Sequence, residues 1–223
     1  MGFVVAIDGT AGSGKTTTAK EVSRRLGWLY LDTGATYRAV AYFVLKRGID
    51  PKNEREVIQS LDNLKIEIKN LNGEQRTIVN GEDVTEKLRT EEINKAVTPI
   101  SKIKEVRRQL VEIQRKIVND KNAIVEGRDI GTVVFPDANI KFYMDADINV
   151  RAERRKQQEG LNNLEKVKED LKRRDHHDST RKESPLKRAS DALFLDTSSL
   201  TIEEQVNIVI SEIKKINEGF SSL

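Results

Sequence analysis

Gly9-Thr10-Ala11-Gly12-Ser13-Gly14-Lys15-Thr16, near the start of the 223-residue chain, decides the fold. This stretch fits the pattern G-x-x-x-x-G-K-[ST] of a phosphate-binding loop, or P-loop. An apolar run, Phe3–Asp8, precedes it, and an amphipathic segment, Gly14–Leu26, follows it. The pattern requires such flanks, so we expect a buried strand, the loop and a helix in that order.

The loop residues indicate what it binds. Glycine at 9, 12 and 14 lets the backbone adopt positive φ and approach phosphates, while the N–H groups at the start of a helix attract anions. Lys15 supplies a mobile positive charge, and the hydroxyl of Thr16 is an oxygen ligand of the kind that Mg²⁺ prefers. We therefore expect a nucleoside triphosphate with Mg²⁺, bound by Gly9, Thr10, Ala11, Gly12, Ser13, Gly14, Lys15, Thr16 and Thr17.

The rest of the chain alternates between strand and helix patterns. Nearly continuous apolar segments predict five buried parallel strands, at Phe3–Asp8, Trp28–Leu31, Ala123–Glu126, Ile140–Asp145 and Leu193–Asp196. Helical patterns lie between them, at Gly14–Leu26, Thr36–Arg47, Ile103–Val118, Asn149–Glu159 and Leu164–Arg174, and a last helix is expected from about Thr201 to Gly219. This order predicts an α/β fold, with a five-stranded parallel sheet doubly wound with helices.

Residues 50–98 break the alternation. Lys65–Lys69 and Thr77–Val79 have a strand-like period, and Asn-Gly pairs at Asn72 and Asn80 bound them. We expect a small antiparallel insert here, within a single domain that spans residues 1–223.

Composition excludes several chemistries. The chain has no Cys, which excludes disulfides, a thiol nucleophile and a cysteine zinc site, and its two His are too few for a histidine metal centre. A formal net charge of +3 argues against a duplex-DNA binder, and no apolar run approaches the length of a membrane span. We expect no nucleic-acid or membrane partner. Without Cys or a recognisable export signal, the expected location is the cytoplasm.

The positive charge is concentrated in one region. Residues 151–191 contain 13 Lys and Arg against 9 Asp and Glu, whereas the remainder contains 26 against 27. A solvated helical surface and a face for anions both fit this distribution.

The P-loop alone does not decide the fate of the γ-phosphoryl group. A GTPase switch needs an Asn-Lys-x-Asp segment, which the sequence lacks, and a motor needs a second domain for which the chain is too short. A small kinase is therefore the leading class.

Three further segments carry a family resemblance: Leu31–Arg38, Glu126–Ala138 and Arg174–Arg181. The first two follow predicted strands, so they should line the same crevice as the P-loop. Together with the loop they resemble the bacterial cytidylate kinases, nucleoside monophosphate kinases with the P-loop kinase fold. The string GRDIGTVV at residues 127–134, followed by Pro136-Asp137-Ala138, is the most specific part, and the resemblance extends from Phe3 to the last helix.

The resemblance implies a set of acceptor-binding residues. Arg38 and Arg128 match arginines on the CMP phosphate. Arg107 falls at the cytosine ring and Asp129 near its amino group, while Arg181 pairs with Asp129. The full implied set is Thr33, Arg38, Thr98, Arg107, Arg128, Asp129, Arg174, Asp178 and Arg181, with Thr98 at the base and Arg174 and Asp178 at the ribose. Glu126 stands where other members have Asp, and no role is assigned to it.

The chemistry agrees with these residue types. A monophosphate acceptor is already ionised at pH 7, so no general base is needed, and arginines can bring two polyanions together. An Asp that accepts from the cytosine amino group and an Arg that donates to ring acceptors would distinguish cytosine from uracil.

Monophosphate kinases close a lid over ATP, which the resemblance places at about residues 156–163. Arg151 and Arg155 share a helix face at i and i+4, so we expect both to reach the transferring phosphates, although a solvated basic face is the alternative. With Lys15 and Arg128 they are the expected catalytic residues.

The expected activity is transfer of the γ-phosphoryl group of MgATP to CMP and dCMP by a monomer. Two alternatives remain open at this point: a kinase of UMP or AMP, or a non-catalytic P-loop module that senses nucleotide or RNA through the basic stretch.

Overall fold

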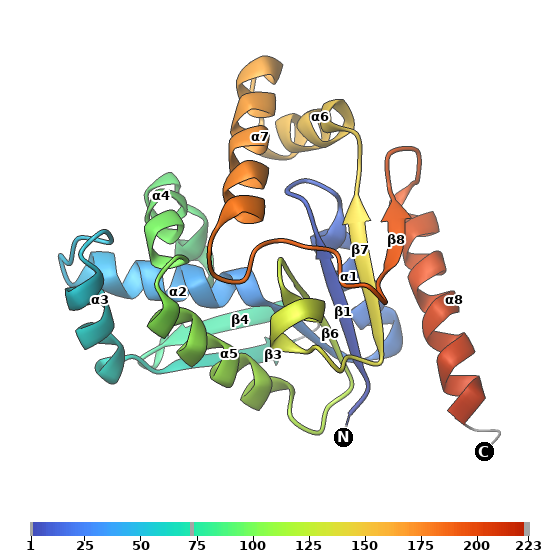
Figure 1. The fold of residues 1–223 in the computed structure, drawn as a ribbon, viewed down its shortest axis with the longest axis horizontal. Coiled ribbons are helices and arrows are strands. Elements are labelled where there is room, and N and C mark those ends of the chain that lie inside the picture. The colour runs from blue at the N-terminus through green and yellow to red at the C-terminus, as the bar shows by residue number, and fades with distance from the viewer. Residues whose placement is uncertain (1, 72–73, 221–223) are drawn as a thin grey trace.

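A five-stranded sheet forms the centre of the computed structural model, which describes residues 2–71 and 74–220 (Figure 1). The strand order is β2-β6-β1-β7-β8, and each neighbouring pair is parallel. The strands are β1 (Val4–Gly9), β2 (Leu29–Asp32), β6 (Ala123–Gly127), β7 (Ile140–Asp145) and β8 (Leu193–Asp196). The predicted parallel sheet is confirmed.

Helices cover both faces of this sheet. On one face, Val5 and Ile7 of β1 pack with α1 (Lys15–Leu26) and α8 (Ile202–Phe220). On the other, Ala6 packs with the end of α5 (Lys104–Val118) and a single π-helical turn, Ile130–Val134. Successive residues of a strand face opposite sides, so the near-continuous apolar pattern reflects burial on both.

One predicted strand differs in its environment. The prediction that β8 is buried like the others is wrong, because Leu193 and Phe194 are 41% and 51% exposed and only Leu195 is buried. The reason is position, since β8 lies at the edge of the sheet with β7 as its neighbour. Sequence pattern alone does not distinguish an edge strand from a central one.

The predicted antiparallel element is confirmed. It has three strands, β3 (Ile66–Leu71), β4 (Glu74–Val79) and β5 (Glu82–Asp83). Asn80 and Gly81 have φ values of 49° and 84°, as a tight hairpin turn requires. The other expected turn, at Asn72, lies outside the described residues. The insert also contains α3 (Glu54–Ser60), α4 (Glu91–Ile100) and two 3₁₀ turns, Leu61–Asn63 and Thr85–Arg89, which were not predicted.

The insert packs on α2 (Thr33–Lys46) through an apolar core that includes Val40, Val44, Val57 and Ile93. Helix α2 begins three residues earlier than predicted, because the Asp32 carboxylate caps it by accepting from the N–H of Ala35 at 3.2 Å. The insert is therefore held directly against the helix that carries Arg38.

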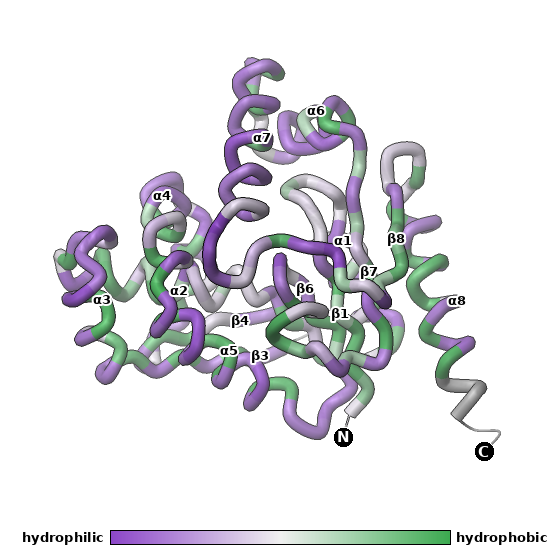
Figure 2. The backbone as a smooth tube through the Cα atoms, in the orientation of Figure 1, coloured by the Kyte–Doolittle hydropathy of each residue, from purple (hydrophilic) through white to green (hydrophobic). Residues whose placement is uncertain are grey.

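Two polar helices stand beyond the carboxyl ends of the strands (Figure 1). These helices are α6 (Ile148–Glu159) and α7 (Leu164–Thr180), which extends six residues beyond its predicted end. Figure 2 shows that α7 is mainly hydrophilic, in contrast to the central strands. A small apolar cluster of Ala152, Val167 and Leu171 holds the pair against Ala11 of the P-loop. Within the described residues, no helix is both long and apolar enough to cross a membrane.

Candidate active site

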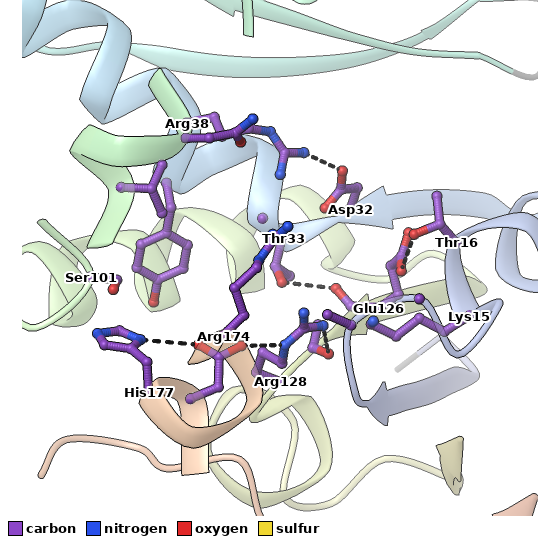
Figure 3. Close-up of a pocket in the computed structure, with 18 of the residues that line it drawn as sticks. Lys15, Thr16, Asp32, Thr33, Arg38, Ser101, Glu126, Arg128, Arg174 and His177 are labelled. Atoms are coloured by element: carbon purple, nitrogen blue, oxygen red, sulfur yellow. Dashed lines mark hydrogen bonds and ion pairs between the residues drawn. The ribbon is translucent and has the colours of Figure 1, made fainter. Parts of the chain in front are cut away.

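A cavity of about 670 Å³ opens at the carboxyl ends of β1, β2 and β6. The P-loop and the start of α2 form two of its walls, the insert closes a third, and α6 and α7 border the remaining side. Figure 3 shows Lys15 and Thr16 on one wall, and Arg128 and Arg174 extending into the same space. Topology therefore brings together the segments that the sequence indicated.

Most of the predicted site residues line this cavity. They are Ala11, Gly12, Gly14, Lys15, Thr16, Thr33, Arg38, Thr98, Arg128, Asp129, Arg155, Arg174, Asp178 and Arg181. The other predicted residues do not line it: Gly9, Thr10, Ser13, Thr17, Arg107 and Arg151.

The P-loop has the backbone that its glycines predict. Gly12 and Gly14 have φ values of 79° and 90°, in the left-handed region that glycine adopts readily. The Lys15 ammonium lies inside the loop, where Nζ donates to the carbonyl of Thr10 at 2.9 Å. Burial, together with the charge of Arg128, lowers the pKa of Lys15 to about 7. This loop therefore holds a cation that phosphate oxygens would stabilise.

Arg151 differs from its expected position at the transferring phosphates. It is 8% exposed, and its guanidinium donates to the carbonyls of Ala11 at 3.1 Å and Ala146 at 2.9 Å. It also pairs with Asp175, whose carboxylate accepts from the N–H of Ala11 at 3.1 Å. Helix periodicity predicted the correct face, but Arg151 reaches the loop backbone and fixes it.

Thr16 and Glu126 form a set of oxygen ligands beside the loop. The Thr16 hydroxyl donates to Oε2 of Glu126 at 2.8 Å, and Oε1 accepts from the hydroxyl of Tyr30. Glu126 is 2% exposed, and burial, followed by the nearby charge of Asp32, raises the pKa of its carboxyl. Hard oxygen ligands fit Mg²⁺. The described residues contain no cluster of three acidic or histidine side chains that could hold a metal by themselves, so phosphate and water oxygens would complete the coordination.

Asp8 connects the central strand to the π-helical turn. Its carboxylate accepts from the N–H groups of Ile130 at 2.7 Å and Gly131 at 2.8 Å. Burial raises the pKa of Asp8 to about 6, although these two donors oppose the shift. Asp8 therefore fixes the segment that follows Arg128 and Asp129.

The raised pKa of Asp8 predicts a pH dependence of stability. The unfolded chain releases this proton near 3.8 and the folded protein near 6, so the linked stabilisation is complete below pH 3.8 and is lost as pH rises through 6. The difference corresponds to about 3 kcal/mol. Asp8→Asn removes the titration. From pH 4 to pH 7, the free energy of unfolding of wild type should fall relative to the variant by this amount, measured by urea titration. A pH-independent difference contradicts the assignment.

Several arginines line the wall of the cavity that is formed by α2, the segment after β6 and α7. Arg38 pairs with Asp32 at 2.6 Å, and Nε of Arg128 donates to Asp178 at 2.7 Å. Among the described residues, no carboxylate bonds to Arg174. Desolvation, with the charges of Arg128 and Arg155, lowers the pKa of Arg174 to about 10. This wall therefore carries more positive charge than its carboxylates balance.

Asp129 lies between two arginines deeper in the site. It forms a buried ion pair with Arg107, and Nη2 of Arg181 lies 3.5 Å from its Oδ1, so the expected pairing of Arg181 with Asp129 is present. The Arg107 guanidinium also lies over Tyr37, at 5.3 Å from the ring centroid. Charge and an aromatic face thus flank the Asp129 carboxylate, which suits a planar polar base.

Some lining residues were missed by sequence reasoning. They include Tyr37, Arg89, Asn94, Ser101, Glu126 and His177. Glu126 had a usable signal, because a carboxylate at the end of a strand beside the P-loop strand must face the loop. Arg89 had none, since it ends a 3₁₀ turn of the insert that no pattern predicted.

Comparison with known proteins places the chain among one family of relatives. The cytidylate kinase family model matches residues 5–215. The cytidylate kinase of Clostridioides difficile is 48% identical over 215 residues, covering 95% of this chain and 98% of that protein. The cytidylate kinase of Thermotoga neapolitana is 44% identical over 223 residues, covering 98% of each.

Among solved structures, a gluconokinase from Sinorhizobium meliloti shares the fold. Its TM-score is 0.51 at 10% identity, and the match covers 99% of this chain and 95% of that one. An uncharacterized protein from Eubacterium ventriosum gives a TM-score of 0.56 at 13% identity, covering 95% of this chain and 98% of that one. The structural likeness shows the fold, whereas the family model and the two cytidylate kinases match nearly the whole chain, and the chain belongs to the cytidylate kinase family.

Proposed function

We propose that the protein transfers the γ-phosphoryl group of MgATP to CMP and dCMP, giving ADP with CDP or dCDP. Family membership makes it a phosphotransferase. The observation that carries the proposal is that two anion sites share one cavity: the P-loop with Lys15, and the arginines Arg38, Arg128 and Arg174. A protein that only senses a nucleotide has no use for a second phosphate site.

Catalysis would rest on position and charge. The acceptor phosphate arrives ionised, so it can attack without a base once the repulsion between the two polyanions is overcome. Arg38, Arg128 and Arg174 would hold the acceptor, and Lys15 would neutralise charge on the donor. Mg²⁺, held by Thr16 and waters on Glu126, would supply charge neutralisation at the phosphate oxygens.

Asp129 would select the base. A carboxylate has about four lone-pair sites, so Asp129 can accept from the cytosine amino group while Arg107 and Arg181 hold it. Uracil has a carbonyl oxygen at that position, which would face the carboxylate without a proton between them. Thr98 and Ser101 of the insert line the same end of the cavity.

We assign residues 50–98 as the acceptor-binding insert and residues 156–163 as the lid of a single domain. The lid segment includes the connection between α6 and α7, two helices that stand beyond the carboxyl ends of the strands (Figure 1). A monomer is proposed because one chain supplies both anion sites, and the cytoplasm because ATP and CMP are found there.

Arg155, on α6 immediately before the proposed lid, provides a test of the expected role of this helix in catalysis. It lies one turn after Arg151 on α6 and lines the cavity. If its guanidinium stabilises the transferring group, Arg155→Ala should lower kcat about 100-fold. Lys172→Ala, a change of an exposed cation on α7 that does not line the cavity, should stay within about twofold in a steady-state assay of ADP formation. A near-unchanged rate for Arg155→Ala would remove this residue from the mechanism.

Radiolabelled ATP gives the direct test of group transfer. With label on the γ-phosphoryl group and CMP present, the label should appear in CDP, with little in inorganic phosphate. Label found only in inorganic phosphate, or no turnover together with salt-dependent RNA binding, would defeat the proposal.

A further inference from the structure

The buried hydroxyl of Tyr30 has no role in the mechanism proposed above. It lies on β2, is 1% exposed, and packs in the apolar cluster beneath α1 with Val22. Its hydroxyl bonds to Oε1 of Glu126, while Oε2 of the same carboxylate accepts from Thr16 at 2.8 Å. Each oxygen of one buried carboxylate is thus held by a different side chain.

The sheet register explains this arrangement. In the parallel pairing of β2 with β6, Tyr30 lies opposite Ile124 and Asp32 opposite Glu126. Tyr30 and Glu126 therefore emerge on the same face of the sheet, two positions apart, which is the face that α1 and Thr16 cover. The tyrosine ring spans this offset and brings its hydroxyl to the carboxylate.

The direction of the hydrogen bond is also fixed. A phenol hydroxyl is protonated at neutral pH, so the Tyr30 hydroxyl donates to Oε1 of Glu126, while Oε2 accepts from Thr16. The carboxylate must accept through Oε1, and the free lone pairs of Oε2 then face Thr16 and the cavity. A glutamate has three rotatable side-chain bonds, and without this contact its carboxylate could rotate away from the loop.

We propose that Tyr30 is a positioning residue, which holds the Glu126 carboxylate at the place beside Thr16 where Mg²⁺ and its waters bind with the nucleotide. This inference rests on the proposed function, because it requires the metal to bind there. Tyr30 lies behind the carboxylate and outside the cavity, so it would affect nucleotide binding only when the metal is present.

Calorimetric titration with ADP, once with excess MgCl₂ and once with EDTA, separates the contribution of the metal to the binding affinity from that of the nucleotide. Tyr30→Phe keeps the ring and removes the hydroxyl. We expect this variant to bind MgADP five- to tenfold more weakly than wild type and to bind metal-free ADP within twofold of wild type. Tyr30→Met, which also lacks the hydroxyl, should give the same pattern if the apolar contacts of the phenyl ring matter little.

A double-mutant cycle tests whether Tyr30 acts through Glu126. Glu126→Gln should weaken MgADP binding at least as much as Tyr30→Phe, and the double variant should be no weaker than Glu126→Gln alone. Tyr42→Phe is the matched control. Its hydroxyl bonds to Glu82 at 3.1 and 3.2 Å in the insert, so its loss should change neither titration.

Three results would overturn the role of Tyr30: equal losses for Tyr30→Phe with and without Mg²⁺, no loss in either, or additive effects in the double variant. Failure of the proposed function looks different. In that case wild type itself would bind ADP equally with Mg²⁺ and with EDTA, and would form no CDP.

Discussion

Lys15→Met should lower kcat about 1,000-fold while the protein stays folded. The ammonium lies inside the P-loop, bonded to the carbonyl of Thr10, and burial with the neighbouring Arg128 lowers its pKa to about 7. Phosphate oxygens would restore a fully charged ammonium, which then offsets the charge that shifts between donor and acceptor. Methionine has a similar length and no charge, so the loop keeps its side-chain volume.

Lys20→Met is the matched control for Lys15. Lys20 lies on the same helix, is exposed, and does not line the main cavity. Its replacement should leave kcat within about twofold of wild type. Both variants should be assayed for CDP formation at saturating ATP and CMP, and their unfolding temperatures compared. A Lys15→Met enzyme with more than a tenth of wild-type kcat would contradict the role of the loop lysine.

Arg128→Ala should lower kcat/KM for CMP by about 1,000-fold, with a smaller change in KM for ATP. Arg128 lines the cavity close enough to Lys15 for its charge to lower the pKa of that lysine, and Asp178 orients the Arg128 guanidinium through a 2.7 Å bond to Nε. Nη1 also donates to the carbonyl of Gly127 at 3.5 Å, and the side chain lines the cavity, where the acceptor phosphate would lie. Removal also leaves Asp178 without this partner, and that negative charge would repel the acceptor.

Arg108→Ala serves as the control for Arg128. This exposed arginine of α5 does not line the cavity, and its loss should leave both kinetic parameters near wild type. Arg128→Lys should recover only part of the activity, because an ammonium lacks the planar fork of donors with which a guanidinium can bond Asp178 and two phosphate oxygens in fixed directions. Full activity in Arg128→Lys would show that charge alone suffices, and an equal rise in both KM values for Arg128→Ala would place the arginine outside acceptor binding.

The parts of the molecule that local pattern determines were predicted well. The P-loop needs glycines at fixed spacing between a strand and a helix, and residues 3–26 contain all of these signals. Apolar runs located the five parallel strands, and the rule that parallel strands end at one edge placed Lys15, Arg38 and Arg128 around one cavity.

The parts that depend on distant contacts were not predictable. Arg151 bonds to the backbone of Ala11, 140 positions away, and helix periodicity gives no information on such a partner. The exposure of Phe194 depends on where β8 falls in the strand order. The role of Glu126 depends on Tyr30 and Thr16, which come from different elements.

The basic region 151–191 shows why charge counts alone were ambiguous. Arg154, Arg155, Arg174 and Arg181 line the cavity, and Arg154 also donates to the backbone carbonyl of Thr197 at 2.6 Å. Others, such as Lys172 on α7, are exposed and do not line the cavity. The interpretation as an anion-binding face and the one as a solvated surface therefore each apply to different residues of the same segment.

The central claim is that the cavity accepts CMP as the phosphoryl acceptor. It is tested most directly by ADP formation from MgATP with CMP, dCMP, UMP and AMP, each at several concentrations. We predict the highest kcat/KM for CMP, turnover of dCMP, and UMP lower than CMP by at least about tenfold, because a single well-placed hydrogen bond discriminates by about 1–3 kcal/mol. A kcat/KM for UMP or AMP above that for CMP would contradict the assignment.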